Sequence, residues 1–174
     1  MHTECQNQSG VTLVELLVVV AILGIIGAIS GLFLLKYLPD YRLRSAVNEL
    51  VQTARLTQSN ALKGIRPWYI EFSVATQSYA MYDSGADGSI GTADDILVKN
   101  TAFSNYDSGV KLGSGPTGEA IITGLATSRA IYTVEGTGLS GGAVRLSNNK
   151  DTTYRITFLR TGSIRSSKWE GMWK

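Results

Sequence analysis

The feature that most constrains this chain is an apolar run from Val11 to Leu35, VTLVELLVVVAILGIIGAISGLFLL, which holds one charge, Glu15, and no proline. A helix rises about 1.5 Å per residue, so about 20 apolar residues are enough to cross about 30 Å of hydrocarbon. The segment before the run contains no Lys or Arg, unlike the basic stretch of a cleaved secretory signal. The sequence therefore predicts a retained helix that crosses a membrane once.

Glu15 is the unusual residue of this run, because a carboxylate in a membrane helix costs on the order of 2.5–3.5 kcal/mol on insertion scales. It lies five residues after Gly10, where a polar stretch changes abruptly to the apolar helix. If the chain were cut after Gly10, the new amine of Val11 would lie about one helical turn from the Glu15 carboxylate of its own chain or of a neighbour. The pattern thus predicts an ion pair that offsets the cost of burying Glu15. A plain anchor with a stray glutamate is the alternative.

The segment SGVTLVELLVVVAILGII resembles the class III signal of type IV pilins and type II secretion pseudopilins. The resemblance implies that a prepilin peptidase cuts after Gly10 and methylates Val11, and that Glu15 guides docking of the subunit into a growing filament. Two positions depart from the family pattern: Val11 stands where Phe or Met is most common, and the leader, residues 1–10, is not basic. It also implies an inner-membrane protein whose partners are other pilins or pseudopilins, the peptidase and an assembly platform.

Three glycines in the apolar run share one face of the predicted helix. Gly24, Gly27 and Gly31 recur at spacings of three and four residues. Small residues at such spacings let a second helix approach closely in a membrane. Glycine is also tolerated in membrane helices without such a role, so both interpretations stay open.

Residues 36–63 are predicted to form an amphipathic helix. Its apolar positions recur at helical spacing, at Leu43, Val47, Leu50, Ala54 and Ala61. Lys63 followed by Gly64 predicts the end of the helix, and Pro39 predicts a kink or a short unwound step. The apolar positions are expected to pack against the chain's own domain rather than in an intermolecular coiled coil, because the heptads are too few.

Residues 64–174 have the pattern of an antiparallel β-rich domain, with β-branched and alternating runs separated by Gly, Ser, Asn and Asp. Short connections indicate antiparallel pairing in two packed layers, with the helix end across one face. The predicted fold class is therefore α+β, a long N-terminal helix packed on this domain. The candidate strands are Trp68–Val74, Ser78–Tyr82, Ile96–Thr101, Gly109–Leu112, Ala120–Ile122, Ala130–Glu135, Ala143–Leu146, Tyr154–Leu159 and Ser163–Arg165.

Two further segments resemble the GspH/FimT group of minor pseudopilins and minor pilins: LVQTARLTQSNALKGIRPWYIEF, and YTVEGTGLSGGAVRLSNNKDTTYRITFLRTGSIRSS near the C-terminus. The resemblance implies a minor subunit of a type IV pilus or type II secretion system, with a periplasmic globular domain. It also implies a division into leader 1–10, transmembrane and assembly helix 11–35, amphipathic half 36–63 and β-rich domain 64–174. Residues 83–128 lie outside these patterns.

A carboxylate-rich loop between two predicted strands is the candidate metal site. It holds three glycines and four carboxylates, Asp83, Asp87, Asp94 and Asp95. Calcium takes six to eight oxygens at about 2.3–2.6 Å, and the loop is similar to the acidic loop of major pseudopilins, which holds calcium. An ordinary solvated hairpin is the alternative, although turn chemistry explains the glycines better than it explains the adjacent Asp94 and Asp95. No other cofactor is expected.

A basic and aromatic segment near the C-terminus is the candidate nucleic-acid site. The segment contains four cations, Arg155, Arg160, Arg165 and Lys168. They are interleaved with the aromatic residues Tyr154, Trp169 and Trp173. Cations can bind phosphates while aromatic rings stack on bases. The family resemblance allows this role, because some FimT-like minor pilins bind DNA during uptake. Ordinary solvated charges are the alternative, and the net charge of +2 over the whole chain names no anionic partner.

Catalysis is not expected. The only histidine, His2, and the only cysteine, Cys5, both precede the predicted cleavage site. The processed chain would therefore lack Ser-His and Cys-His nucleophiles and histidine-ligated zinc. Asp94 and Asp95 are a poor acid–base pair, because adjacent residues of a strand point to opposite faces. The sequence favours a structural or binding subunit over an enzyme.

Overall fold

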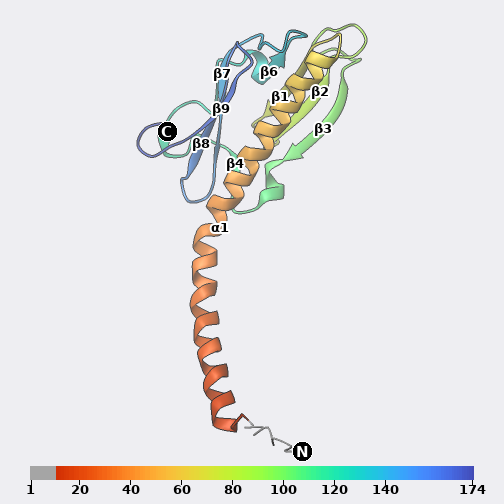
Figure 1. Ribbon diagram of the computed structural model, residues 1–174. Helices are drawn as coiled ribbons and strands as arrows, with labels where there is room; N and C mark the ends of the chain where they lie inside the picture. Colours follow the sequence, from red (N-terminus) through yellow and green to blue (C-terminus); the bar gives the residue numbers. More distant parts are fainter. Residues whose placement is uncertain (1–10) are drawn as a thin grey trace, which may run out of the picture. The chain divides into compact units, whose positions relative to one another are not determined.

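The computed structural model describes residues 11–174, except for the side chains of residues 29–35. Residues 1–10, with the predicted cleavage residue Gly10, lie outside the described part. One long helix, α1 (Leu13–Lys63), is followed by strands and short 3₁₀ helices. The chain divides into two compact units, Met1–Tyr37 and Leu38–Lys174 (Figure 1).

The first unit contains the start of α1. The helix begins at Leu13 because Thr12 caps it: the Thr12 hydroxyl accepts a hydrogen bond from the Glu15 backbone N–H at 3.2 Å, and the Thr12 carbonyl accepts one from Leu16 N–H at 3.2 Å. A threonine followed three residues later by glutamate is the capping-box pattern. Among the residues described, the structure contains no helix whose length and apolar character would let it cross a membrane. The membrane span predicted over residues 11–35 stays a prediction.

The second half of α1 belongs to the globular unit. One stripe of its side chains is 0–1% exposed, and it consists of Leu43, Ala46, Val47, Leu50, Ala54 and Ala61. The helix ends at Lys63 as expected, and Gly64 N–H closes the last turn on the Asn60 carbonyl at 2.8 Å. The unwound step predicted at Pro39 is absent, because every residue from Leu13 to Lys63 is helical. A proline removes one N–H from the helical ladder, and the rest of the ladder holds the helix on both sides.

Two antiparallel sheets complete the globular unit. The first has the order β3-β2-β1-β6, with β1 (Trp68–Ser73), β2 (Ser78–Asp83), β3 (Ile96–Ala102) and β6 (Arg129–Tyr132). The second has the order β4-β7-β8-β9 with β5 also paired to β7, and its strands are β4 (Lys111–Leu112), β5 (Ile122–Thr123), β7 (Gly142–Ser147), β8 (Thr153–Phe158) and β9 (Ile164–Lys168). The 3₁₀ helices are η1 (Phe103–Tyr106), η2 (Gly115–Thr117) and η3 (Ala126–Ser128).

A single core joins α1 to both sheets. The buried stripe of α1 packs with Ile70 and Phe72 of β1 and with Val144 and Ile156 of the second sheet. The rings of Phe72 and Phe158 lie 5.9 Å apart between the sheets. Figure 1 shows this half of α1 running alongside β1 and β2. The predicted α+β architecture, with the helix end laid on antiparallel sheets, is confirmed.

All of the predicted strands are present, and the differences lie at their ends. The strand expected over Ala130–Glu135 ends at Tyr132, because Thr133 N–H bonds the Thr137 carbonyl and Gly136 N–H bonds the Thr133 carbonyl, which turns the chain. The strand expected over Gly109–Leu112 is reduced to β4, because positive φ angles of 53° at Asp107 and Ser108 and 67° at Gly109 exclude extended backbone. The last predicted strand continues past Arg165 to Lys168.

Candidate functional site

The predicted assembly residues lie at the start of α1. Val11 directly precedes the capping Thr12, and Glu15 lies exposed in the first turn. The helix macrodipole is positive at this end, so it favours the Glu15 carboxylate. Sequence reasoning missed Thr12, although the pattern Thr-x-x-Glu before an apolar run was the available signal. The Glu15 backbone N–H thus takes part in the cap, and the pairing predicted for the Glu15 carboxylate stays a prediction.

The helix beyond Glu15 presents apolar side chains on all sides. Every large apolar side chain described from Val11 to Ile26 is 49–80% exposed. Gly24 and Gly27 have no heavy atom within 4 Å of the position that a Cβ would take. A helix that is apolar all round is stable only when something covers it, such as lipid or other helices. This segment therefore needs a covering beyond its own helix.

The acidic loop begins with an ion pair between a buried carboxylate and a half-exposed arginine. Asp83 ends β2, and its Oδ1 lies 3.0 Å from Arg66 Nε. The same oxygen accepts a hydrogen bond from the Gly85 N–H at 3.3 Å. Arg66 Nη1 also donates to the Gly85 carbonyl at 2.7 Å. A Cβ on Gly85 would lie 2.3 Å from the Asp94 carbonyl oxygen, so the two sides of the loop pass very close together there. Asp83 therefore serves to hold the loop to the end of α1.

The other carboxylates of the loop accept hydrogen bonds from the loop and from β1. Asp95 Oδ2 accepts from Tyr69 OH at 2.5 Å and from Gly91 N–H at 2.7 Å. Asp94 accepts from Thr92 OH at 2.6 Å and from Asp87 N–H at 3.1 Å. The Thr92 hydroxyl, followed by the Asp87 N–H, lowers the pKa of Asp94. Burial, followed by the hydrogen bond to Asp95, raises the pKa of Tyr69.

The predicted calcium site therefore lacks support from this geometry. Asp83 is paired with Arg66, and Asp94 and Asp95 are occupied by protein donors. Asp87 accepts from Ser89 N–H at 2.7 Å and so forms its own small turn. Within residues 11–174, no group of three or more His, Cys, Asp or Glu side chains is placed to hold a metal ion. Calcium stays a prediction, and the loop has a structural explanation without it.

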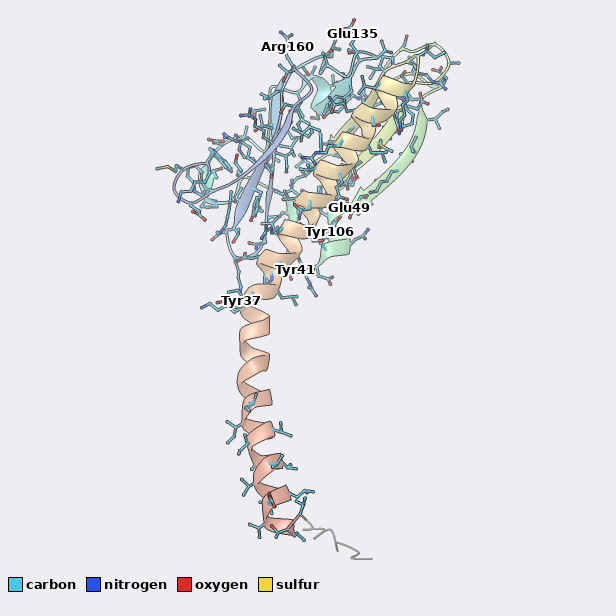
Figure 2. All side chains as sticks on the ribbon, viewed as in Figure 1. Tyr37, Tyr41, Glu49, Tyr106, Glu135 and Arg160 are labelled. Atoms are coloured by element: carbon cyan, nitrogen blue, oxygen red, sulfur yellow. The ribbon has the colours of Figure 1, made fainter. Side chains whose placement is uncertain are left out.

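The four cations predicted to bind nucleic acid do not share one surface. Arg155 pairs with Ser167, and Arg165 pairs with Thr157, so both arginines lie on the face of the second sheet that points away from the core. Lys168 pairs with Tyr154 and lies on the opposite face, where its Nζ is 3.4 Å from Glu170. Arg160 lies outside the strands, in the turn after β8 (Figure 2). The structure brings together only Arg155 and Arg165.

A tryptophan from the C-terminal segment covers two arginines of this outer face. The Trp173 ring lies over both guanidinium groups. Its centroid is 4.4 Å from Arg155 Cζ and 5.7 Å from Arg145 Cζ. Arg145 is 4% exposed and forms an ion pair with Glu119. Trp173 Nε1–H donates to the other Glu119 oxygen at 3.3 Å. The hydrogen bond from Trp173 lowers the pKa of Glu119, and Arg145 lowers it further.

A second charged cluster joins α1 to the first sheet. Glu49 lies 2.8 Å from Lys99 Nζ of β3, and it accepts hydrogen bonds from Tyr106 OH and from Tyr79 OH. Figure 2 shows Glu49 and Tyr106 side by side. Sequence reasoning did not single out Glu49 and so missed this cluster. No local pattern could have found it, because Lys99 and Tyr106 lie 50 and 57 residues away in the chain.

The comparisons with known proteins agree with this fold and with the N-terminal pattern. A model of the prokaryotic N-terminal methylation motif matches residues 5–31. A model of the type II transport protein GspH matches residues 46–162, more than half of the chain. No curated protein matches significantly.

Two kinds of solved structure resemble this one. The type IV minor pilin FimU of Pseudomonas aeruginosa is 14% identical with a TM-score of 0.54, covering 78% of this chain and 94% of its own. The minor pseudopilin EpsH of Vibrio cholerae is 12% identical with a TM-score of 0.50, covering 73% of this chain and 97% of its own. At these identities the likeness shows the fold alone. Together with the two family models, it supports the resemblance inferred from the sequence: the chain belongs to the GspH family of pilin-like proteins and carries its N-terminal methylation motif.

Proposed function

We propose that this protein is a minor pilin or minor pseudopilin that is cleaved after Gly10, methylated at Val11 and assembled through α1 into a filament or its tip. The observation that carries the proposal is the capped start of α1, where Val11 precedes Thr12 and Glu15 lies in the first turn. A cut after Gly10 places a new amine at this helix end, within reach of a carboxylate. The methylation-motif match over residues 5–31 supports the same cut.

The exposed apolar half of α1 supports assembly. Side chains from Val11 to Ile26 need a covering of lipid before assembly and of neighbouring helices afterwards. Gly24 and Gly27, open on their own helix, are sites where a second helix could approach closely. We propose an inner-membrane subunit with a periplasmic globular unit and a structural rather than catalytic role. Its partners would be other pilins or pseudopilins, a prepilin peptidase and an assembly platform.

The first experiment measures processing. The full chain is co-expressed with a prepilin peptidase and its intact mass is determined. We expect the loss of residues 1–10 and the gain of one methyl group. The matched control is Gly10→Val, which should block the cut. An unchanged mass, or cleavage at any other bond, would refute the proposal.

The second experiment separates the two roles of Glu15. Glu15→Gln keeps a side chain that can complete the capping box but removes the charge, whereas Glu15→Ala removes both. If the carboxylate pairs with the Val11 amine, both variants should be cleaved normally and both should be depleted from sheared filaments by about tenfold or more. If Glu15 only caps the helix, Glu15→Gln should be incorporated like the unchanged chain. That result would remove the assembly role from Glu15.

A filament subunit that displays a DNA-binding domain is the alternative. Arg155 and Arg165 on one outer face favour it, whereas the pairing of Lys168 with Glu170 on the other face does not. The test is a salt-dependent mobility shift of duplex DNA by the full chain in detergent, repeated with Arg155→Gln and Arg165→Gln. DNA binding that both variants weaken would support the alternative. The absence of a shift at low salt would rule it out.

A further inference from the structure

Three arginines in the described part of the chain stack on aromatic rings. Arg129 lies over Tyr69 at 5.3 Å from Cζ to the ring centroid, and Arg145 and Arg155 both lie over Trp173, at 5.7 and 4.4 Å. A stacked guanidinium keeps its edge free for hydrogen bonds in its own plane, so stacking and a bidentate carboxylate can be satisfied together. A stacked arginine with no anion is therefore an incomplete arrangement.

Two of the three arginines have a resident carboxylate. Arg129 lies 2.9 Å from Glu71, and Arg145 is paired with Glu119. Arg155 forms no ion pair with any residue that the structure describes, although it is the most closely stacked of the three. Glu119 is close enough to feel its charge, but both Glu119 oxygens are already used by Arg145 and Trp173.

The burial of Arg155 makes the missing anion costly. The side chain as a whole is half-buried without an ion pair among the described residues, and its buried Nε, like that of Arg145, has no hydrogen-bond partner. A charged donor that loses water without gaining an acceptor costs free energy, whereas a charge-assisted hydrogen bond restores it. Arg155 is held in place by its strand and by Trp173, so its outward edge is ready to receive an oxyanion at little cost in conformational entropy.

The neighbours of Arg155 indicate which partner carries the anion. Arg165 is its diagonal neighbour on the same face, about 7–8 Å away for such pairs in general, and it is exposed without an ion pair among the described residues. Trp173 lies against Arg155, and Met172, the residue before it in the chain, is 65% exposed. Arginine, tryptophan and methionine are the residue types that protein interfaces favour. Two unpaired cations are too few for tight DNA binding, which neutralises many phosphates.

We infer that Arg155, with Arg165 beside it, binds a carboxylate on an acidic segment of a neighbouring filament subunit. The Arg155–Trp173 stack is then the centre of a protein interface on the outer face of β7, β8 and β9, and the incoming Asp or Glu side chain takes the place that Glu119 fills for Arg145. Charge complementarity selects the partner. The identity of the partner as a filament subunit rests on the proposed function, whereas the carboxylate site does not.

The test follows the Nε–H signals of the arginines by nuclear magnetic resonance, with the ¹⁵N-labelled full chain in detergent micelles. The probe is a pentapeptide, blocked at both ends, with glutamate at its second and fourth positions and glycine elsewhere. The control peptide carries glutamine at the two glutamate positions. Arg155→Lys assigns the Arg155 signal, and Arg129, which already has a carboxylate, is the internal control. Inorganic phosphate and a short DNA duplex are added in separate titrations.

We expect the glutamate peptide to shift the Arg155 signal and the glutamine peptide to leave it in place, with Arg129 unchanged in both. Arg155→Lys keeps the charge but loses the planar fork, so the affinity for the glutamate peptide, followed in this variant on the Arg165 signal, should fall about tenfold while the Arg145 signal stays in place. A response to both peptides alike, a response only to phosphate or DNA, or full affinity in Arg155→Lys would overturn the inference.

Cleavage after Gly10 is measured on the same chain. Peptide binding without cleavage would refute the proposed function and leave the carboxylate site standing, whereas cleavage without peptide binding would refute the site alone.

Discussion

The cluster around Glu49 gives the most direct test of how α1 is fixed to the first sheet. Glu49 Oε1 lies 2.8 Å from Lys99 Nζ, Tyr106 OH donates to the other oxygen, and Tyr79 OH lies 3.5 Å away. Hydrogen bonds to a charged group contribute about 1.5–3 kcal/mol each when buried, and exposed ion pairs contribute about 0–1 kcal/mol. The Glu49 side chain is 38% exposed, so the lower values apply.

Replacing Glu49 should therefore destabilise the globular unit by a measurable amount. We expect Glu49→Ala to lower the free energy of unfolding by about 2 kcal/mol, and Glu49→Gln, which can still accept one hydrogen bond, by about 1 kcal/mol. For a unit of this size, 2 kcal/mol corresponds to a fall in Tm of about 6–10 °C. The assay is thermal unfolding at pH 7 of residues 38–174, which contain every buried residue described.

The pH dependence gives the same prediction a second, independent readout. The hydrogen bond from Lys99, followed by that from Tyr106, lowers the pKa of Glu49 from its ordinary value of 4.5. A carboxyl whose pKa is lowered on folding stabilises the fold above the unfolded pKa, and that stabilisation is lost as the pH falls through the folded pKa. The difference in Tm between Glu49→Gln and the unchanged protein should thus be full at pH 7 and shrink below about pH 4.

The control is Glu135→Gln, because Glu135 is exposed, forms no ion pair among the described residues, and lies well away from Glu49 (Figure 2). It should leave Tm within about 1 °C of the unchanged value. If the Glu49→Gln protein were as stable as the unchanged one at pH 7, the cluster would not stabilise the packing of α1 on the first sheet. A difference in Tm that stays constant down to pH 3 would also contradict the prediction.

Three shorter predictions follow from single contacts. Gly136→Ala should destabilise by about 1–3 kcal/mol in urea unfolding, because φ is +73° and the added Cβ would lie 2.7 Å from Leu62 Cδ2. Trp173→Ala should cost about 2–4 kcal/mol by the same assay, because it removes the ring over Arg155 and the hydrogen bond to Glu119. Millimolar Ca²⁺ should change Tm by less than about 1 °C, because the loop carboxylates already have protein partners, and a rise of several degrees would restore the predicted calcium site.

The elements of the fold were predictable because each leaves a local pattern. The stripe from Leu43 to Ala61 repeats at helical spacing, and Lys63 followed by Gly64 marks the end of the helix. The alternation along β8 is equally clear. Strand ends were less predictable because they depend on turns. Thr133, Val134 and Thr137 favour strands by residue type, yet they lie in a turn that is set by backbone hydrogen bonds.

The site was only partly predictable, because some of its parts come from distant segments. Glu15 is conspicuous in sequence, as a charge in an apolar run draws attention by itself. Arg145 and Glu119 gave no such signal, because their ion pair joins β7 to a segment without any regular pattern. The placement of Lys168 on the opposite face from Arg155 was not foreseen, because the last strand was expected to end at Arg165 and the alternation was not carried to Lys168.

The proposed cleavage after Gly10 would give the position of Glu15 an electrostatic reason, because α1 begins at Leu13, shortly after that bond. The N-terminal end of α1 already carries the positive end of the macrodipole, and its first N–H groups lack helical acceptors. If cleavage exposes an amine at Val11, it adds a full positive charge directly before the Thr12 cap, where that charge is unfavourable. A carboxylate in the first turn compensates both, and Glu15, at the third helical position, can do so while its own N–H remains bonded to the cap. When neighbouring helices cover the apolar side chains from Val11 to Ile26, solvent screening falls and the same compensation strengthens. If the protein assembles as proposed, the charge is tolerated in the isolated helix and is most stabilising in the assembled one, and the comparison of Glu15→Gln with Glu15→Ala tests this.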